Sequence, residues 1–321
     1  MKQGNLEGKI MKYANIEGVK LPVSKIILGT STNACFQGEN CDEVFNEALN
    51  LGITTFDTAR VYGKSEEIIG DWMERTGARE KVNILSKGGH HSPLLIKRLK
   101  EKDILYDIGL SLEKLKTDYI DIYLLHRDDT KIPVGEIVET LNGLYAKGKI
   151  KAFGGSNWTK ERIEAANEYA YKRNLQPFTF SSPYFGLADM KESFFAYGLV
   201  GLTGEEKAAD RKWYTENQMP VVAYSTLASG LYSGKMEKPS DLRPFWVRSA
   251  FGDKKNFEKL ERCKELAKKK GCTVAQLAIA WSLHSEMNVF PIVGASKVKT
   301  LQSSVEALNI TLTDEEYAYL G

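Results

Sequence analysis

Short apolar runs recur along the whole chain, and a stretch of amphipathic pattern follows most of them. The runs are rich in β-branched and aromatic residues and are bounded by Gly, Ser or charged residues. Near-continuous hydrophobicity of this kind is typical of strands that are buried on both faces of a parallel sheet. We therefore expect eight strands, at 24–30, 52–58, 82–87, 120–126, 150–156, 178–182, 220–225 and 288–294.

Between these runs, apolar residues repeat at the spacing of one helix face. Thr159 stands where an N-cap is expected, because its hydroxyl can accept a hydrogen bond from the first turn. The last stretch is apolar on most sides, which predicts a well buried helix. Helices are expected at 41–51, 102–116, 134–149, 159–174 and 273–286.

Eight strands that alternate with helices predict an α/β fold of the (β/α)₈ TIM-barrel type. An open doubly wound sheet is the main alternative. The count of eight and the absence of G-x-G-x-x-G after the first strand favour the barrel. No change in composition divides the chain, so a single domain over 1–321 with long loops at the C-terminal face is expected.

Three segments fall outside the simple repeat. Residues 1–22 are interpreted as an N-terminal extension, in which 9–22 form a hairpin that closes the barrel floor. The insert 188–213 carries aromatic residues and is interpreted as a lid or an oligomer contact. The segment 229–256 is long for a loop, and loops of that length usually have a function.

Charge and composition limit the partners. Lys and Arg number 44 against 42 Asp and Glu, for a formal charge of +2, so nothing indicates a nucleic-acid partner. No apolar run approaches the roughly 20 residues that cross a bilayer, and the N-terminus lacks a signal peptide's apolar segment. The four cysteines form no C-x-x-C pair, and no histidine or acid spacing predicts a metal site. We expect a cytoplasmic protein with reduced thiols, no membrane partner and an oligomeric state that the sequence leaves open.

The candidate chemistry lies where the predicted strands end, which is where TIM barrels place their active sites. Asp57 ends the second strand and Tyr62 follows it, while Lys87 and His126 end the third and fourth. Singly, such residues are often caps, rim residues or packing aromatics. Together they would make a costly core, because each buried charge must be paired. A lysine beside a phenol lowers its pKa, so the set suits proton delivery to a developing alkoxide.

The residues from Leu28 to Leu308 resemble the aldo-keto reductase superfamily. The family is a (β/α)₈ barrel of NADPH-preferring carbonyl reductases. The resemblance rests on an ordered set of motifs, LGT, FDTARVYGKSEEIIG, SKGG, YLLHRDD, GGSNW, AYSTLASGLYSGK and VFPIVGASKVKTLQSSVEAL.

The resemblance implies roles for individual residues. Tyr62 would be the general acid, Lys87 paired with Asp57 would tune it, and His126 would orient the carbonyl oxygen. Ser156 and Asn157 would bind the nicotinamide amide. The other expected cofactor contacts are Gly29 and Thr30 below the cofactor, Tyr224 on the nicotinamide ring, Ser225, Thr226, Leu227, Ser229 and Gly230 along the pyrophosphate, and Gly294, Ala295, Ser296 and Lys297 at the adenosine ribose.

The chain departs from the family pattern at three cofactor positions. Ser181 replaces the glutamine that usually ends strand six, and Ser304 lies where an acid-asparagine pair commonly reads the adenine. Thr300 replaces a common basic residue, although Lys297 and Lys299 are close by. Lysine charge favours a 2′-phosphate, so NADPH is expected over NADH, which stays possible. Lys297→Glu is then expected to abolish the preference for NADP⁺ over NAD⁺.

The substrate itself is weakly specified. Aromatic residues in the variable loops and an arginine near Tyr62 are the candidate substrate contacts, namely Phe36, Arg60, Trp158, Phe245 and Trp246. Arg127 and Arg243 could meet an anionic or hydroxyl-rich substrate. The expected function is reduction of an aldehyde or ketone, with sugar-like carbonyls included, to an alcohol. The alternatives are a nucleotide-binding auxiliary subunit and a non-redox barrel isomerase that uses Tyr62 and His126.

Overall fold

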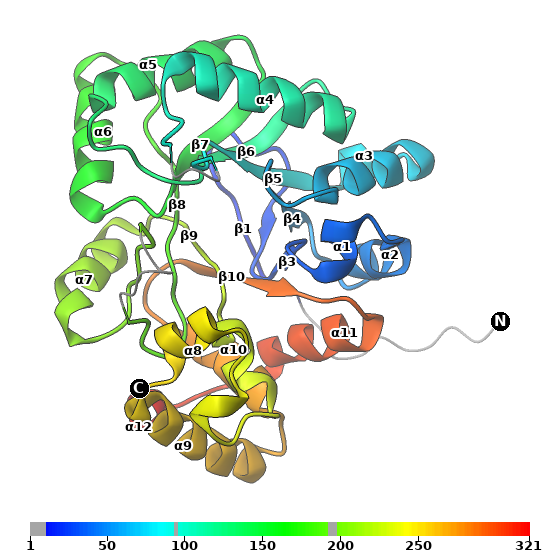
Figure 1. Cartoon of the computed structure of the whole chain (residues 1–321), viewed down its shortest axis with the longest axis vertical. Coiled ribbons are helices and arrows are strands. Elements are labelled where there is room, and N and C mark those ends of the chain that lie inside the picture. The colour runs from blue at the N-terminus through cyan, green and yellow to red at the C-terminus, as the bar shows by residue number, and fades with distance from the viewer. Residues whose placement is uncertain (1–10, 93–95, 192–197) are drawn as a thin grey trace.

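The computed structural model describes residues 11–92, 96–191 and 198–321. Eight parallel strands form a closed barrel in the order β10-β3-β4-β5-β6-β7-β8-β9, so the predicted TIM barrel is confirmed (Figure 1). The strands are β3 (Ile27–Gly29), β4 (Thr55–Asp57), β5 (Asn83–Gly88), β6 (Ile120–Leu125), β7 (Ile150–Ser156), β8 (Phe180–Ser182), β9 (Val221–Ala223) and β10 (Val289–Gly294).

Helices surround the barrel (Figure 1). Thr159 caps α6 as expected, since its side chain accepts from the backbone N–H of Arg162. The described α-helices are α1 (Asn33–Gln37), α2 (Asp42–Asn50), α3 (Ser65–Thr76), α4 (Glu101–Leu115), α5 (Val134–Ala146), α6 (Lys160–Lys172), α7 (Ala208–Asn217), α8 (Phe245–Phe251), α9 (Lys254–Lys270), α10 (Val274–His284), α11 (Val298–Glu306) and α12 (Asp314–Leu320).

Two apolar clusters hold the barrel together. The smaller fills its interior and includes Leu85, Ile122 and Phe290, which belong to three different strands. The larger lies between the strands and the surrounding helices. Because successive strand residues point to opposite faces, a strand that feeds both clusters must be apolar at almost every position. This is the physical reason for the continuous apolar runs in the sequence.

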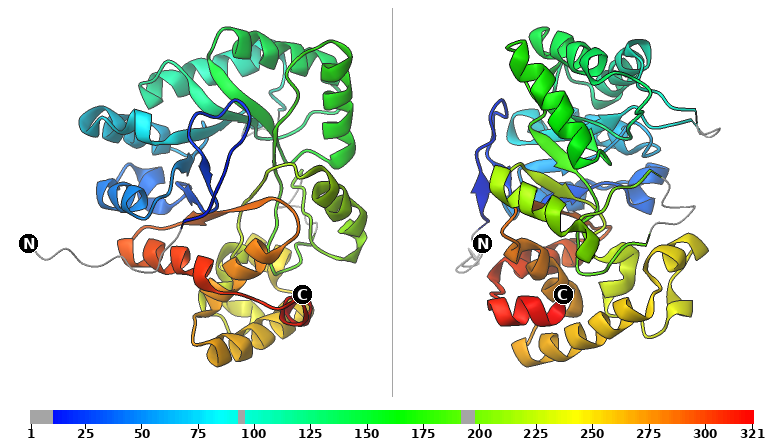
Figure 2. Two further views of the ribbon diagram at one scale, coloured as in Figure 1. Left: turned by 180° about the vertical axis from the view of Figure 1, so that it is seen from behind. Right: turned by 90° about the vertical axis from the view of Figure 1, so that its left-hand side faces the viewer.

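A hairpin covers one end of the barrel. Strands β1 (Tyr13–Ala14) and β2 (Val23–Ser24) pair antiparallel, and Ile16 and Val19 in the turn pack against the interior cluster. In the side view, this hairpin and α8 lie at opposite ends of the molecule (Figure 2). The hairpin returns at 23–24, so the predicted strand 24–30 is really the end of the hairpin plus the shorter β3. Residues 9 and 10 of the predicted hairpin lie outside the described residues.

The two long segments contain more regular structure than a loop. The segment 229–256 contains most of the 3₁₀ helix η4 (Ala228–Ser233). It also contains the 3₁₀ turn η5 (Pro239–Asp241) and the helix α8. In the insert 188–213, residues 192–197 lie outside the described residues. Its next residues run back to the barrel, where the N–H of Leu202 donates to the carbonyl of Tyr184 at 2.9 Å. The interpretation as a lid or oligomer contact stays a prediction.

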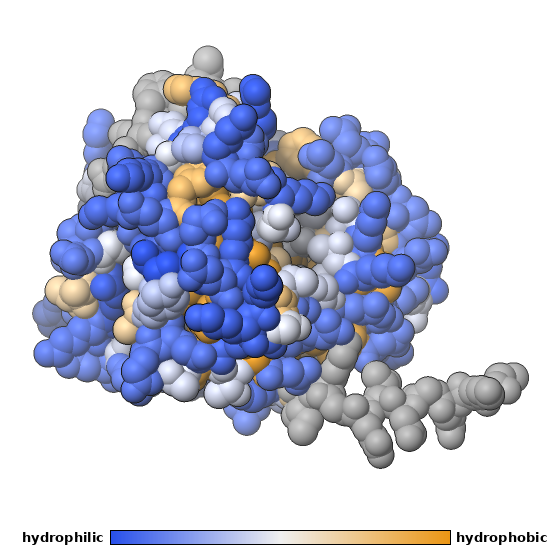
Figure 3. All heavy atoms as spheres, turned by 90° about the horizontal axis from the view of Figure 1, so that it is seen from below, coloured by the Kyte–Doolittle hydropathy of each residue, from blue (hydrophilic) through white to orange (hydrophobic). Residues whose placement is uncertain are grey.

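The surface seen from below is largely hydrophilic, with apolar residues in small separate areas (Figure 3). Among the described residues, no helix is both long and apolar enough to cross a membrane.

Candidate active site

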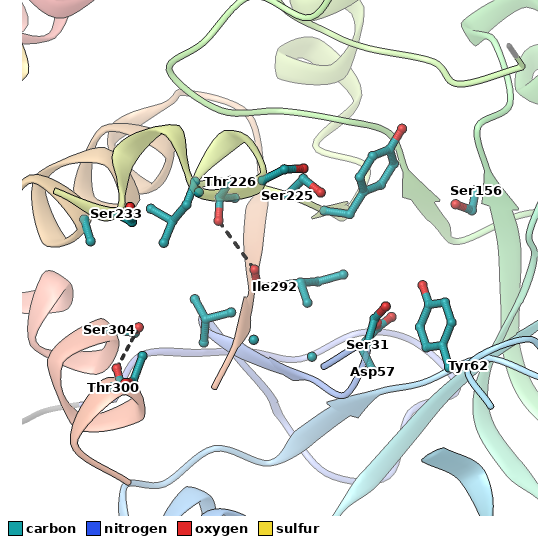
Figure 4. Close-up of a pocket in the computed structure, with 18 of the residues that line it drawn as sticks. Ser31, Asp57, Tyr62, Ser156, Ser225, Thr226, Ser233, Ile292, Thr300 and Ser304 are labelled. Atoms are coloured by element: carbon teal, nitrogen blue, oxygen red, sulfur yellow. Dashed lines mark hydrogen bonds between the residues drawn. The ribbon is translucent and has the colours of Figure 1, made fainter. Parts of the chain in front are cut away.

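A cavity of about 840 Å³ lies at the carboxyl ends of the barrel strands. It is elongated, with Asp57 and Tyr62 at one end, Thr300 and Ser304 at the other, and the loop after β9 along one side (Figure 4). We refer to these as the reaction end and the α11 end. The cavity brings together residues of β3, β4, β5, β7 and β10 and residues that directly follow β6 and β9, as expected for the mouth of a TIM barrel.

An ion pair between neighbouring strands anchors the reaction end. Asp57 is the last residue of β4 and Lys87 belongs to β5, and the register pairs Asp57 with Leu85. The Lys87 ammonium forms an ion pair with Asp57 and donates to the carbonyl of Thr58 at 3.0 Å. Both side chains are buried, and removing either partner would leave an uncompensated charge. Burial opposes the charge on Lys87, but Asp57 and Tyr62 raise its pKa, so it remains protonated at neutral pH.

The turn after β4 presents Tyr62. The N–H of Tyr62 donates to the Ala59 carbonyl at 2.9 Å, which closes a tight turn before α3. Gly63 follows with φ of +57°, and a Cβ there would stand 2.4 Å from the Phe36 carbonyl oxygen. Only glycine combines that backbone conformation with so close an approach. The glycine after the tyrosine therefore allows the phenol to face Lys87, whose ammonium lies 5.1 Å from the ring centroid.

Burial and Lys87 act on the Tyr62 phenol in opposite directions. Burial raises the pKa of Tyr62, and the Lys87 charge offsets part of that rise. Lys87 thus lowers the pKa of Tyr62, as the sequence predicts, but burial has the larger effect and the net shift is upward. The phenol is protonated at neutral pH and has a proton to donate.

His126 completes the reaction end. It follows β6, and its N–H donates to the Gly88 carbonyl at 2.7 Å, which ties it to the strand that carries Lys87. Its ring meets the Tyr62 ring edge to face, with centroids 5.7 Å apart. Burial, with help from Lys87 and Arg127, lowers the pKa of His126 well below its usual value. The imidazole is therefore neutral and can donate one hydrogen bond without bringing a charge.

A polar network continues from β7. Asn157 has φ of +59°, a conformation that asparagine tolerates better than most residues. Its amide nitrogen donates to the His126 carbonyl at 3.2 Å and to the Ser156 hydroxyl at 3.1 Å. Its amide oxygen accepts from the Tyr224 hydroxyl at 2.7 Å. The network fixes Ser156, Asn157 and Tyr224 on the wall beside His126.

The loop after β9 has an unusual backbone along the middle of the cavity. Ser225, Ala228 and Ser229 have φ of +54°, +48° and +50°, and Gly230 has φ of +104°. Positive φ in non-glycine residues is costly and clusters at ligand sites. The Thr226 hydroxyl donates to the Ile292 carbonyl at 3.4 Å, which attaches the loop to β10 (Figure 4).

Hydroxyls and lysines line the α11 end. Ser304 donates to the Thr300 carbonyl at 3.0 Å within α11 (Figure 4). The amide of Gln276 donates to the Ser303 hydroxyl at 3.2 Å. Lys235 and Lys299 also line this end. The donor set suits a phosphorylated, hydroxyl-bearing ligand.

Comparison with known proteins assigns the family. The model of the aldo/keto reductase family matches residues 25–321. The chain belongs to the aldo/keto reductase family. It is 30% identical to versiconal hemiacetal acetate reductase of Aspergillus parasiticus, over 97% of this chain and 96% of that protein. It is 29% identical to aldo-keto reductase YhdN of Bacillus subtilis (strain 168), over 95% of this chain and 91% of that protein. It is 30% identical to aldo-keto reductase str7 of Strobilurus tenacellus, over 86% of this chain and 78% of that protein.

Aldo/keto reductases are oxidoreductases that use nicotinamide cofactors, so the coarse functional class expected from the sequence holds. Most of the expected site residues of this reductase lie together in the cavity. They are Asp57, Tyr62, Lys87 and His126, with Gly29, Ser156, Asn157, Tyr224, Ser225, Thr226, Leu227, Ser229, Gly230, Gly294 and Ser304.

Five expected cofactor residues of the reductase do not line the cavity. Ser181 is buried, and its hydroxyl is 2.7 Å from that of Tyr214, on the side of β8 away from the cavity residues. Thr30 is buried and donates to the Asp57 carbonyl at 2.8 Å, so it supports the site from behind. Ala295, Ser296 and Lys297 occupy the turn before α11, where Lys297 is the N-cap residue. The α11 helix turns Lys299 toward the cavity instead.

The expected substrate contacts are corrected as well. Trp158 is fully buried and donates to the Arg127 carbonyl at 3.3 Å, so it supports the wall rather than touching a ligand. The Nε of Arg60 lies 3.7 Å from the Asp107 carboxylate. This ion pair explains why an arginine stands near Tyr62, because it ties the turn to α4. Phe36, Phe245 and Trp246 are exposed and stand outside the residues that line the cavity.

Some lining residues carried no usable sequence signal. Thr273, Ala275 and Gln276 come from a segment whose pattern predicts only a helix, while Ser233, Ile292 and Val293 lie inside family motifs that gave them no role. His90 could have been found, because it follows the SKGG motif directly. Leu199 lies in the insert 188–213 and lines the cavity. No sequence motif indicates this role of Leu199.

Proposed function

We propose that this protein is an NADPH-dependent carbonyl reductase in which Tyr62 is the general acid. One observation carries the proposal: a protonated, buried phenol, a charged lysine held by Asp57 and a neutral imidazole converge at one end of a long cavity lined by hydroxyls and lysines. That combination matches the needs of proton delivery beside a bound dinucleotide.

The cavity residues fit a nicotinamide dinucleotide. The cavity volume of about 840 Å³ is in the range of cofactor sites. A Cβ at Gly230 would meet nothing within 4 Å, so the strained loop after β9 leaves its backbone open to a ligand. The dinucleotide, when bound, supplies the hydride.

The chain's own residues perform the rest of the reduction. Tyr62 donates its hydroxyl proton to the carbonyl oxygen as negative charge develops there. Lys87 stabilises the resulting phenolate, and Asp57 keeps Lys87 in place. His126, neutral at physiological pH, donates a hydrogen bond to the same oxygen. Asn157 and Ser156 would hold the nicotinamide amide, and Tyr224 would pack on the nicotinamide ring.

The preference for NADPH over NADH rests on the α11 end. Lys235 and Lys299 line it, and both residues are exposed. Lysines in such positions favour an added phosphate. Lys297, which the sequence suggested for this role, belongs to the turn outside.

The test is a fluorescence titration with NADPH, followed by steady-state assays with aldehydes and ketones. We expect NADPH fluorescence to shift on binding and several carbonyls to be reduced. Tyr62→Phe is expected to bind NADPH normally and to lose about 10²- to 10⁴-fold in kcat.

Each other outcome has a distinct meaning. No fluorescence change at saturating NADPH would contradict the dinucleotide site and favour a non-redox enzyme. Binding without reduction of any carbonyl would favour an auxiliary nucleotide-binding subunit. An unchanged kcat in Tyr62→Phe would remove the general-acid role from Tyr62.

A further inference from the structure

Arg127 is a half-buried cation at the reaction end of the cavity. It follows His126 directly, lines the cavity, and its Nη1 donates to the His126 carbonyl at 2.8 Å. Its Nε is buried and has no hydrogen-bond partner. Within the described part of the chain, no carboxylate forms an ion pair with it.

The surrounding carboxylates are already paired with other cations. Two aspartates follow Arg127 in sequence. Asp128 accepts from Arg162 at 2.9 Å, and Asp129 lies 3.6 Å from the Lys97 ammonium. Asp57 belongs to Lys87. The arrangement therefore leaves one positive charge uncompensated beside the reacting groups.

The histidines next to Arg127 add hydrogen-bonding capacity without charge. His90 lines the cavity, and its ring meets the His126 ring edge to face with centroids 4.9 Å apart. Burial lowers the pKa of His90 to about 4. Its Nδ1 lies 2.9 Å from the His91 carbonyl, which favours the proton on that nitrogen. Arg127 alone thus determines the net charge on this side of the pocket.

The buried Nε of this half-buried guanidinium has no hydrogen-bond partner, and a buried polar group without a partner is costly. Here the missing anion must come from a ligand, because the cavity is the open side of the residue. A guanidinium offers parallel N–H groups that match a carboxylate or a phosphate. Arg127 and Tyr62 both line the cavity and interact electrostatically, so one small molecule can place an anion at Arg127 and its carbonyl at Tyr62.

We propose that Arg127 selects carbonyl substrates that carry an anionic group, a carboxylate or a phosphate, a short chain away from the carbonyl. This assignment rests on the proposed reductase function and names the substrate class of the same site. Arg127 binds the anion, and Tyr62 and His126 hold the carbonyl oxygen. Neutral His90, whose Nδ1 proton faces the His91 carbonyl, can accept a further hydrogen bond at Nε2.

Matched aldehyde pairs test the assignment with NADPH as reductant. Succinic semialdehyde is compared with butanal, and glyceraldehyde 3-phosphate with glyceraldehyde. We expect the wild-type protein to favour the anionic member by about 100-fold in kcat/KM. In Arg127→Gln most of this preference is lost, measured as the ratio of kcat/KM between the two members of each pair. Arg127→Lys is expected to keep part of the preference, because it keeps the charge but not the fork of donors.

Each result decides between specific readings. A preference for one anionic pair alone identifies the carboxylate or the phosphate as the ligand group. Equal rates within both pairs overturn the assignment while leaving the reductase function intact. Reduction of no carbonyl overturns the proposed function itself. A rise of more than about 10-fold in the NADPH Kd of Arg127→Gln, with substrate preference unchanged, would show that Arg127 binds the cofactor. That result would also overturn the assignment of Arg127 to the substrate anion.

The wild-type protein alone provides a second measurement if the variants fail to fold. Raising the ionic strength from about 0.02 M to about 0.3 M screens charge attraction. We expect kcat/KM to fall for the anionic substrates relative to their neutral partners. Parallel responses within each pair would contradict the assignment.

Discussion

The two ends of the cavity are built on different principles. At the reaction end, charged groups are buried, and Lys87 and Asp57 hold each other across adjacent strands. At the α11 end, serines, threonines and exposed lysines line a more open wall. Buried charge in a low-dielectric interior tolerates little change, because each group depends on a partner at fixed distance. Exposed hydroxyls can be exchanged at small cost. The departures from the family pattern at Thr300, Ser303 and Ser304 all fall at the tolerant end.

Breaking the ion pair is expected to have the largest effect. Lys87→Met leaves Asp57 buried without a cation, and we expect a loss of about 3–5 kcal/mol in the free energy of unfolding, measured in urea. The double variant Lys87→Met/Asp57→Asn removes both charges and should recover much of that stability without recovering activity. If the double variant were as unstable as the single one, the Asp57 charge would not be the cause.

The buried neutral histidine predicts a pH dependence of stability. The pKa of His126 is well below its usual value in the folded protein, so below about pH 6.5 the unfolded chain binds a proton that the folded protein does not. The unfolded state then binds more protons, and stability falls as pH falls from about 7 to about 5. The contribution is at most about 1.4 kcal/mol per pH unit.

Urea titrations across this pH range measure the slope. His126→Asn should reduce the slope, and the part that remains comes from His90, whose pKa burial also lowers. Equal slopes in the wild type and His126→Asn would show that His126 is charged in the folded protein.

At the α11 end, a charge reversal should act on the cofactor alone. Lys299→Glu is expected to lower the preference for NADP⁺ over NAD⁺ by about 10-fold, because it replaces an attractive charge with a repulsive one. Lys297→Glu is the matched control: it makes the same charge change two residues earlier, outside the residues that line the cavity. A larger change in the Kd ratio for the control would restore the role that the sequence suggested for Lys297.

The smallest effect is expected at strand β8. Ser181→Ala should change the Kd for NADPH by less than about 3-fold, because the Ser181 hydroxyl pairs with Tyr214 and does not reach the cavity. The titration by fluorescence would contradict this placement if the Kd rose by more than about 10-fold.

The reaction end could be predicted well because each residue stands at a fixed place relative to a strand. In a parallel barrel all carboxyl ends point to one mouth, so knowing that Asp57, Lys87 and His126 end strands is enough to bring them together. The α11 end could not be predicted as well. There the side-chain direction depends on where α11 begins and how it turns, and an error of two residues selects Lys297 instead of Lys299.

The substrate wall was predicted least well. Aromatic residues in loops carry no periodic signal that separates a wall from a support, and Trp158 proved to be buried behind Arg127. Arg60 and Arg127 look alike in sequence, each beside a site residue. Only the folded chain shows that Asp107 pairs with Arg60, while the acids beside Arg127 are held by Arg162 and Lys97.

The sequence by itself determined the barrel, the family and the four residues of the reaction end, because strand-end motifs in a fixed order depend on local pattern and on the common direction of parallel strands. Only the tertiary structure decided which hydroxyls and lysines face the cavity, which aromatics support it, and which arginine is left without an acid. Those outcomes depend on the rotation of helices and on competition among charges that are distant in sequence. Neither can be determined from a single stretch of the sequence.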